Sequence, residues 1–409
     1  MKRILLVAAT TGYQIRSFAD AAHRLGIEVA LATDRCHVLE DPWRDRAVPI
    51  RFNDPASVQA IIAAGPFDGI LAVGDRPAYF AALAAVALGV PFHSPASVDA
   101  ARNKFLTKQR FAEAGLPVPR FSRMSTADDP AQHSSLATYP CVLKPLGLSA
   151  SRGVIRVNNA AEFTTAFCRI KALLARPEIR LSGEDQDQYI QVESFLAGRE
   201  YALEGLVTAG RLQTLAVFEK PDPLDGPFFE ESIYLTPPRQ PLSRLVPAVE
   251  QAVRALGLTH GPVHAEMRDD GEQTWVLEVS PRPIGGLCAK ALRFDGAVPL
   301  EEILLRHAAG EDVTHFTRER IASGVMMIPI PASGVFESAE GVENATAVAG
   351  VEEIAITAKA GQTLEKLPEG SSYLGFIFAR GSTSEQVDRS LRQAHSKLRF
   401  RIAAKLPVI

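Results

Sequence analysis

The stretch PVHAEMRDDGEQTWVLEVSPRPIGG, residues 262–286, predicts two strands joined by a polar turn. Apolar and polar residues alternate along residues 263–268 and again along residues 274–280, and this period of two is typical of strands. The intervening DDGEQ has the composition of a hairpin loop. If the loop is centred on Glu272, then Glu266 and Glu278 lie directly opposite each other on one face.

Two opposed glutamates need a neutralising partner. Cβ atoms of directly opposed side chains are roughly 5 Å apart, and like charges at that distance are destabilising. A magnesium ion would neutralise them, since it binds carboxylate oxygens and leaves coordination positions for phosphate. Ser280 shares their face and Arg282 follows the strand, so both are candidates for the same site. A loop centred on Asp270 and Gly271 would break the register, and ordinary solvated glutamates on an edge hairpin are the alternative.

Length, charge and composition are those of an ordinary globular protein. The chain has 409 residues, a formal net charge of −3, 46% hydrophobic residues and 22% charged residues. The length predicts two or three domains, and the near-neutral charge argues against a nucleic-acid surface. No run is apolar over the ~20 residues that a membrane helix needs. The four cysteines form no CxxC pair, which argues against a disulfide or metal framework and favours the cytoplasm.

The first 93 residues predict a doubly wound α/β domain, because apolar strands alternate with helices. The predicted elements are strands at residues 4–8, 27–32 and 69–73 and helices at residues 16–25, 58–64 and 78–88. No GxGxxG follows the first strand, so a dinucleotide site of that kind is not predicted. Ligands bind beyond the carboxyl ends of strands in such sheets, which makes Gly12 and Gly74-Asp75-Arg76 candidate substrate contacts.

A long helix is predicted over residues 97–114, with Ser97 as its N-cap and Gly115 as its stop signal. Lys104 lies on this helix. A lysine there would ordinarily be part of a solvated helix face, so Lys104 gains interest only from its context.

A loop of small residues, PLGLSASRG at residues 145–153, lies between two predicted strands at residues 139–144 and 154–157. Such a loop can present successive backbone N–H groups to phosphate oxygens. Lys144, at the entrance to the loop, would add a point charge. The loop lacks the GKS or GKT of a Walker sequence, so alone it is a weak signal.

The rest of the chain alternates strands and helices, and beyond about residue 315 it predicts a small α+β lobe. The predicted strands are residues 188–195, 201–207, 211–219, 324–330, 351–357 and 373–380, and the predicted helices are residues 244–257, 300–309 and 384–397.

Four pieces occur in an order that resembles the ATP-grasp enzymes, which include biotin carboxylase and the D-alanine–D-alanine ligases. They are Lys104, CVLKPLGLSASRGV at residues 141–154, VESFLAGREYALEG at residues 192–205, and HAEM with LEVSPRPIGG at residues 264–267 and 277–286. The match covers roughly residues 1–310. The terminal lobe and EKPDPLDGPFFEES, residues 219–232, make the chain similar to the bacterial L-amino-acid (dipeptide) ligases.

This resemblance implies an α/β protein with three parts. They are a Rossmann-like pre-ATP-grasp domain over residues 1–93, an ATP-grasp domain over residues 94–312 with its nucleotide-clamping subdomain at about 116–195, and a C-terminal α+β lobe over residues 313–409. The implied activity is that of an ADP-forming carbon–nitrogen ligase. Such an enzyme joins a small-molecule carboxylate to an amine through an acyl phosphate.

The resemblance also implies a role for each matched residue. The two lysines Lys104 and Lys144 would hold the ATP phosphates, and the loop with Ser149, Ser151 and Gly153 would close over the triphosphate. The other implied nucleotide contacts are Glu193 and Leu196 at the adenine edge and Glu200 at the ribose hydroxyls.

Metal and substrate residues follow from the same resemblance. Glu266 and Glu278 match the carboxylates that bind Mg²⁺ or Mn²⁺, and Arg282 matches a contact to the acyl phosphate or substrate carboxylate. Many relatives have asparagine where this chain has Ser280, so the third metal ligand is in doubt. Glu204, four residues after Glu200, keeps the same strand face and is a secondary candidate. Substrate candidates are Glu231, His264, Gly285 and Gly286.

The implied chemistry suits these residue types. A carboxylate is a poor acyl donor because its leaving group would be oxide, whereas an acyl phosphate made from ATP loses phosphate when an amine attacks. This reaction needs alignment and cations rather than a nucleophilic side chain. Two alternatives stay open: a carboxylase or purine-pathway enzyme that activates bicarbonate or formate, and a non-catalytic nucleotide-binding module. A homodimer is compatible with the composition.

Overall fold

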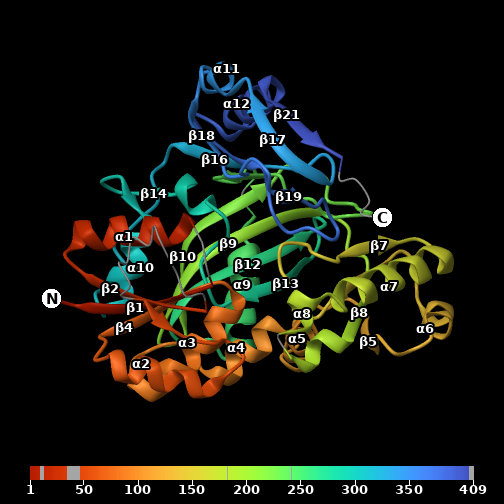
Figure 1. The fold of residues 1–409 in the computed structure, drawn as a ribbon, viewed down its shortest axis with the longest axis horizontal. Helices are drawn as coiled ribbons and strands as arrows, with labels where there is room; N and C mark the ends of the chain where they lie inside the picture. The colour runs from red at the N-terminus through yellow and green to blue at the C-terminus, as the bar shows by residue number, and fades with distance from the viewer. Residues whose placement is uncertain (10–12, 35–46, 182, 241, 405–409) are drawn as a thin grey trace.

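The computed structural model describes residues 1–9, 13–34, 47–181, 183–240 and 242–404. Gly12, a predicted substrate contact, lies outside the described residues. Figure 1 shows three parts arranged around a central sheet: the N-terminal part in red and orange, residues 120–195 in yellow, and the C-terminal part in blue.

A parallel four-stranded sheet forms the N-terminal part. Its strands are, in order, β3 (Val48–Pro49), β2 (Glu28–Thr33), β1 (Arg3–Ala8) and β4 (Gly69–Val73). Ile4 and Leu6 of β1 enter one core, and the alternate residues Leu5 and Val7 enter another. Both faces of β1 are therefore buried, which is why its sequence is continuously apolar.

Helices cover both faces of this sheet, and the predicted doubly wound fold is confirmed. One face packs against α2 (Val58–Ala64) and α3 (Asp75–Leu88), and the other packs against α1 (Tyr13–Leu25) and α10 (Leu300–Ala308). Because α10 lies more than 200 residues beyond β4, one of the four helices that cover the N-terminal sheet comes from a distant part of the chain.

The single helix predicted over residues 97–114 is wrong, because the structure has two helices there. They are α4 (Pro95–Arg102) and α5 (Lys104–Glu113), separated by Asn103 with φ −108° and ψ 108°. The Asn103 side chain accepts hydrogen bonds from the backbone N–H groups of Phe105 and Leu106, which makes it the N-cap of α5.

The break has a consequence for the site. Ser94, rather than the predicted Ser97, caps α4. Lys104 becomes the first residue of α5 instead of a mid-helix residue, and its backbone N–H donates to the carbonyl of Leu146 at 3.1 Å. The start of α5 is thereby joined to the small-residue loop.

A second, antiparallel sheet contains the small-residue loop. Its order is β5 (Phe121–Ser125), β8 (Tyr189–Ser194), β6 (Cys141–Pro145) and β7 (Ile155–Val157). Three helices accompany it: α6 (Pro130–Leu136), α7 (Ala160–Leu174) and α8 (Pro177–Arg180). The sequence reasoning did not identify α7, although Phe163, Phe167 and Ile170 repeat at helical spacing and are buried.

The central sheet is antiparallel throughout and has eight strands. Its order is β13 (Thr274–Ser280), β12 (Gly261–Asp269), β9 (Arg199–Thr208), β10 (Arg211–Lys220), β11 (Ile233–Thr236), β16 (Ala322–Ile328), β20 (Gly375–Gly381) and β18 (Val351–Ile356). The last three strands belong to the predicted C-terminal lobe, so the sheet continues across the predicted boundary at residue 312. Both that boundary and the one at residue 93 stay predictions.

Smaller elements complete the fold. A three-stranded sheet consists of β19 (Thr363–Leu364), β17 (Gly334–Glu340) and β21 (Arg399–Ala403), and a short ladder of β14 (Arg293–Phe294) and β15 (Val298–Pro299). The remaining α-helices are α9 (Leu245–Leu256), α11 (Val342–Thr346) and α12 (Ser384–Lys397). α9 packs beside the central sheet and shares a core with the apolar faces of β9, β12 and β13.

The β12–β13 hairpin pairs Glu266 with Glu278, as predicted, but the loop position and the strand register that produce this pair differ from those predicted. Its loop is residues 270–273, so the loop is not centred on Glu272. The pairs next to the loop are Asp269 with Thr274, Arg268 with Trp275 and Met267 with Val276. A β-bulge then inserts Leu277 into β13, and this extra residue shifts Glu278 into register with Glu266.

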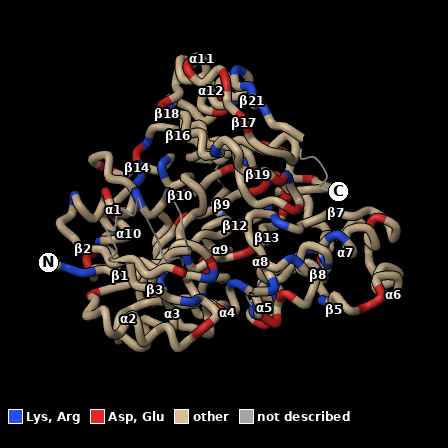
Figure 2. The backbone as a smooth tube through the Cα atoms, viewed as in Figure 1, with Lys and Arg blue, Asp and Glu red and all other residues tan. Residues whose placement is uncertain are grey.

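Basic and acidic residues are interspersed along the backbone in all parts of the fold, as the blue and red segments of Figure 2 show. This distribution fits the formal net charge of −3. Among the described residues, no helix is both long and apolar enough to cross a membrane.

Candidate functional site

A cavity of about 470 Å³ is lined by residues from all three parts of the fold. The sequence-predicted site residues that line it are Lys104, Lys144, Ser149, Ser151, Glu193, Leu196, Glu200, Glu231, His264, Glu266, Glu278, Arg282, Gly285 and Gly286. Among the described residues, the predicted residues that lie off this lining are Gly153, Ser280, Arg76 and the secondary candidate Glu204. Residues predicted from four separate pieces of sequence therefore meet at one place.

The two predicted phosphate lysines both reach this cavity. The Nζ of Lys104 donates to the carbonyl oxygen of Leu148 at 2.5 Å, which places its charge at the small-residue loop. The Nζ of Lys144 forms an ion pair with Glu193 at 2.5 Å. Lys144 thus connects the predicted phosphate contacts with the predicted adenine contact.

The small-residue loop bends sharply toward the cavity. Ala150 and Ser151 have φ of 54°, and Gly153 has φ of 76°, in the left-handed region. A Cβ on Gly153 would lie 2.7 Å from a side-chain carbon of Pro145, so this position needs glycine. The Gly153 N–H donates to the carbonyl of Pro368, in the C-terminal part, at 2.7 Å.

Glu193 is a buried carboxylate held in its charged form. Burial raises its pKa, but the charges of Lys144 and Lys108 outweigh burial and hold the pKa below its ordinary value. Gln191 Nε2 also donates to this carboxylate at 2.5 Å. Lys108 was not identified from the sequence; it lies one helical turn after Lys104 on α5.

Charged side chains alternate on the cavity face of β9 and β12. The strand register places Glu200 beside Arg268 and Glu204 beside His264, so Glu200 and Glu204 share a face as predicted. Arg268 Nε donates to Glu200 at 3.1 Å, and its Nη1 donates to the carbonyl of Leu196 at 2.7 Å.

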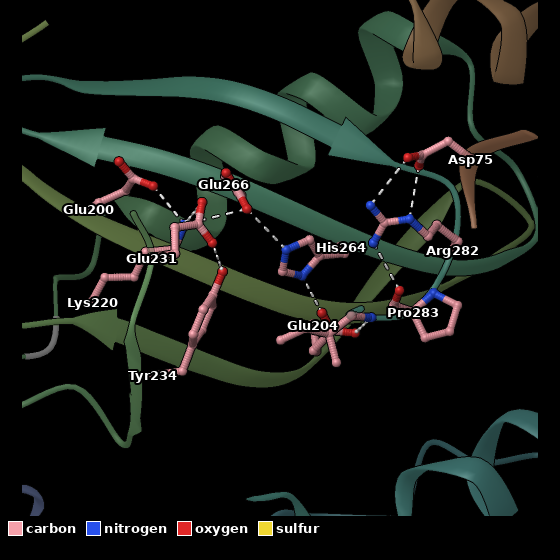
Figure 3. Close-up of polar contacts among 11 residues, drawn as sticks. Asp75, Glu200, Glu204, Lys220, Glu231, Tyr234, His264, Glu266, Arg282 and Pro283 are labelled. Carbon is pink, nitrogen blue, oxygen red and sulfur yellow. Dashed lines mark hydrogen bonds and ion pairs between the residues drawn. The ribbon is translucent and has the colours of Figure 1, made fainter. Parts of the chain in front are cut away.

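Lys220 is the principal site residue that sequence reasoning missed. Its Nζ lies 2.6 Å from Glu200, 2.9 Å from Glu231 and 3.4 Å from Glu266, as Figure 3 shows. Burial lowers the pKa of Lys220, but the three carboxylates outweigh burial and hold the pKa well above its usual value. The signal available in the sequence was the alternation of β10, which places Lys220 opposite Glu200.

The carboxylates around Lys220 differ from one another. Burial and the charge of Glu266 raise the pKa of Glu231 to about 7, and the Tyr234 hydroxyl donates to Glu231 at 2.5 Å. Burial also disfavours charge on Glu266, but Lys220 and His264 outweigh burial and hold its pKa far below the ordinary value. Glu266 is therefore ionised at neutral pH.

His264 links two of the acidic residues (Figure 3). Its Nδ1 donates to Glu204, and its Nε2 lies 3.4 Å from Glu266. Burial lowers the pKa of His264, but these carboxylates raise it to about 9, so the ring is cationic at neutral pH. The backbone N–H of Ile284 donates to the second oxygen of Glu204 at 3.1 Å, which fixes that carboxylate.

Arg282 is held by a carboxylate of the N-terminal domain. Its Nε and Nη2 lie 2.8 Å and 3.4 Å from the two oxygens of Asp75, which is the first residue of α3. Burial lowers the pKa of Arg282 and raises that of Asp75. The attraction between the two charges outweighs burial, so the pKa of Arg282 is above its ordinary value and the pKa of Asp75 is below it. Gly74 and Asp75 line the cavity as predicted, whereas Arg76 lies 3.7 Å from Glu184.

The two adjacent glycines of the lining differ in their surroundings. A Cβ on Gly285 would meet no atom within 4 Å, so this position faces open space. Gly286 has φ of 62°, and a Cβ there would lie 2.9 Å from the Phe376 ring. Cys288 also lines the cavity, but burial raises the pKa of its thiol, which disfavours a thiolate nucleophile.

The donor set fits a divalent cation. Glu278 lies directly opposite Glu266, and ligand oxygens of Glu200, Glu231 and Glu266 lie within 4.8 Å of one another. Carboxylate oxygens are the ligands that Mg²⁺ prefers. Lys220 already contacts all three carboxylates of the second group, Glu266 included, and the assignment of a cation to Glu266 and Glu278 stays a prediction.

Family models match three parts of the chain. The ATP-grasp N-terminal domain matches residues 19–92, the ATP-grasp domain matches residues 137–291, and the L-amino acid ligase C-terminal domain 2 matches residues 326–403. The chain therefore belongs to the ATP-grasp ligases. Within that class, its C-terminal lobe is of the kind found in L-amino acid ligases, and the resemblance stated from the sequence is confirmed.

Individual relatives agree with this placement. The crystal structure of an L-amino acid ligase from Bacillus licheniformis is 26% identical, with a TM-score of 0.83 over 98% of this chain and 99% of that chain. An uncharacterized protein, y4rH, from Sinorhizobium fredii is 23% identical over 98% of this chain and 84% of its own length. A D-alanine–D-alanine ligase from Bordetella avium is 26% identical over 45% of this chain and 56% of its own.

Proposed function

We propose that this protein is an ATP-dependent carboxylate–amine ligase that joins L-amino acids or close analogues, with release of ADP and phosphate. The observation that carries the proposal is the opposed pair Glu266 and Glu278 in a cavity that also contains Lys104, Lys144 and Arg282. Phosphoryl transfer needs this combination of acidic metal ligands and fixed cations.

The nucleotide would occupy the side of the cavity between the small-residue loop and β8. Lys104 and Lys144 would bind the phosphates, and Glu193 and the backbone at Leu196 would contact the adenine edge. Glu266 and Glu278 would hold a magnesium ion, which neutralises charge along the triphosphate when bound. Glu200 is fixed by Lys220 and Arg268, so its carboxylate can accept ribose hydroxyls without moving.

The acid and amine would meet at the end of the cavity near Arg282. Asp75 fixes the guanidinium plane, and Arg282 so held can contact the substrate carboxylate or its phosphorylated form. Positive charge there stabilises the oxygen that gains charge when the amine attacks. Gly285 leaves space for the substrate there, whereas Glu231, the predicted ammonium contact, lies beside Glu200 and Lys220, away from Arg282 in Figure 3.

A screen of phosphate release over pairs of L-amino acids tests this function. We expect ADP and phosphate to form only when Mg²⁺, ATP, an acid and an amine are all present. Glu278→Gln should lower the rate at least about 100-fold because one of the two metal carboxylates loses its charge. Glu272→Gln, in the exposed loop of the same hairpin, is the matched control and should retain the wild-type rate.

Three outcomes would contradict the proposal. Formation of AMP would exclude an acyl phosphate made by γ-phosphoryl transfer. ADP release that depends on bicarbonate without an amino acid would indicate a carboxylase. Tight ATP binding without turnover across the whole panel would indicate a non-catalytic nucleotide-binding module.

A further inference from the structure

The β-bulge in β13 decides which way Glu278 points. Along an uninterrupted strand, consecutive side chains point to opposite faces. Here Leu277 and Glu278 both line the cavity, while Val276 and Val279 on either side of them are buried in the core beneath the sheet. The bulge therefore places two consecutive side chains on the cavity face.

Without the bulge, the proposed metal pair would not form. The register set next to the loop would place Leu277 opposite Glu266 and Glu278 opposite Ala265. Ala265 is fully buried in the core shared with α9. Glu278 would then point away from the cavity into an apolar environment, where an unpaired carboxylate is very costly.

A buried lysine from another element holds this bulge. The Nζ of Lys108, on α5, donates to the backbone carbonyl oxygens of Val276 at 3.0 Å and Leu277 at 2.7 Å. The extra residue of a bulge has no partner in the strand ladder, so its carbonyl needs another donor. The Lys108 side chain provides one, because it reaches β13 from α5.

Burying a lysine at this position is costly, but the lysine supplies the donor that the carbonyl of Leu277 needs. Lys108 is 1% exposed, and burial lowers its pKa to about 8. An apolar side chain of similar length would avoid the cost of burying an ammonium group. Lys108 lies four residues after Lys104, so one face of α5 carries both the lysine at the small-residue loop and the lysine at the bulge.

We propose that Lys108 is a positioning residue: its ammonium group fixes the backbone of residues 276–277 so that Glu278 faces Glu266 across the cavity. This inference rests on the proposed function, because it takes these glutamates as the metal pair. Lys108 acts through the carbonyls of Val276 and Leu277 and needs no contact with the cation or with the carboxylate of Glu278.

Calorimetric titration with ADP, once in Mg²⁺ and once in EDTA, tests this proposal on the full-length protein. We expect Lys108→Met to lose roughly tenfold or more of the Mg²⁺-dependent gain in ADP affinity, as other residues that orient metal ligands do. The ADP affinity in EDTA should stay within about threefold of wild type, because Lys144 still pairs with Glu193 at 2.5 Å and Leu277 faces the cavity in either register. Lys108→Arg, which keeps a charged donor, should restore part of the gain.

Arg244→Met is the matched control. Arg244 pairs with Asp269 at the loop end of the same hairpin, before the bulge, so this variant weakens the hairpin without altering the bulge. It should retain the Mg²⁺-dependent gain. Equal losses in Arg244→Met and Lys108→Met would mean that general loosening is responsible and would overturn the proposal.

A double variant shows whether Lys108 acts through Glu278. Lys108→Met combined with Glu278→Gln should bind Mg²⁺ and ADP no worse than Glu278→Gln alone, and independent losses would contradict the proposal. If Lys108→Met does not fold, Lys108→Gln replaces it, with a smaller loss in the same direction. A full Mg²⁺-dependent gain in the folded Lys108 variant overturns this inference alone, whereas a wild-type protein without any gain overturns the proposed function as well.

Discussion

The ammonium group of Lys220 neutralises part of the negative charge on the acidic side of the cavity. Three carboxylates that come from β9, β12 and the segment before β11 converge on its ammonium group. Such a cluster is stable only while positive and negative charges are matched, because little water reaches it. Its fixed geometry is what lets Glu200 and Glu266 keep their positions before any substrate arrives.

Replacing Lys220 should therefore destabilise the fold. Lys220→Met leaves three buried carboxylates without their shared cation, and we expect the free energy of unfolding to fall by about 3–5 kcal/mol. Urea denaturation followed by circular dichroism measures this change. Lys290→Met removes a half-exposed partner of Glu353 and serves as the control, with an expected change of at most about 1 kcal/mol. Equal effects in the two variants would argue against a stabilising role for the cluster.

The sequence could identify most of the charged residues that line the cavity but not how they are paired. Period-two alternation was enough to place His264 and Glu266 on one face of β12, but the position of Glu278 depends on the bulge at Leu277, which alternation does not predict. The contact between Arg282 and Asp75 joins residues 207 positions apart and is set by the packing of two domains. Local alternation could place Lys220 opposite Glu200, but not beside Glu231, which follows a loop whose course no local pattern predicts.

At the scale of elements, a strap from the C-terminal lobe holds the small-residue loop. The strap is residues 365–369. Its backbone carbonyls accept hydrogen bonds from residues of the loop, and its glutamates form ion pairs with arginines near the loop. Arg152 Nε donates to the carbonyl of Glu369 at 2.7 Å, and Arg169 forms a two-pronged ion pair with the Glu369 carboxylate. Arg176 makes a similar pair with Glu365, with both distances 2.7 Å.

Weakening this strap should affect nucleotide binding before chemistry. Glu369→Ala removes the carboxylate that anchors Arg169, so the loop should close less often over the triphosphate. We expect the KM for ATP to rise roughly 3–10-fold with a smaller change in kcat. Steady-state assays at varied ATP measure both constants. Glu352→Ala, which removes a carboxylate of the same lobe that pairs with Arg293 and Arg380 away from the strap, is the control, and an equal rise in its KM would contradict this role.

Local sequence patterns predicted many elements with their observed bounds. The helices Val58–Ala64 and Ser384–Lys397 and the strand Gly69–Val73 have the predicted bounds, with Gly65 after the first helix and Thr383 as the N-cap of the second. The two departures nearest the site are the break at Asn103 and the bulge at Leu277. Each depends on a side-chain-to-backbone hydrogen bond, which periodicity does not register.

At the scale of the molecule, a histidine cluster lies where the N-terminal domain meets β12. His93 accepts the backbone N–H of Thr259 on Nδ1 at 3.1 Å, and its Nε2 donates to the carbonyl of Pro262 at 3.2 Å. Its neighbours His260 and His307 stack with their ring centroids 4.3 Å apart. Burial lowers the pKa of His93 to about 3 and that of His307 to about 4.

These histidines should make the protein sensitive to acid. The pKa values of these histidines are lower in the folded protein than the unfolded value near 6.5. Between about pH 6.5 and pH 4 the unfolded chain therefore binds more protons than the folded protein, and the free energy of unfolding decreases as the pH is lowered. Each such histidine lowers the free energy of unfolding by up to about 1.4 kcal/mol for each pH unit of acidification. His93→Gln, which keeps one acceptor and one donor, should make the decline shallower between pH 6.5 and pH 5.

Urea denaturation at pH 7.5, 6.0 and 5.0 measures that decline. His23→Gln, at an exposed position in the last turn of α1, is the control and should keep the wild-type slope. If His93→Gln and the wild type lose stability in parallel, the acid response belongs to other groups.

The central sheet also limits how this enzyme can be cut or recombined. β11 forms hydrogen bonds with β10 on one side and with β16 on the other, and β16 lies beyond the predicted boundary at residue 312. Removing the C-terminal lobe would leave β11 as an open strand edge lined with buried apolar side chains, and such edges recruit other chains. Chimaeras between related ligases should therefore exchange the lobe together with β11. The β11–β16 pair would then always come from one and the same protein.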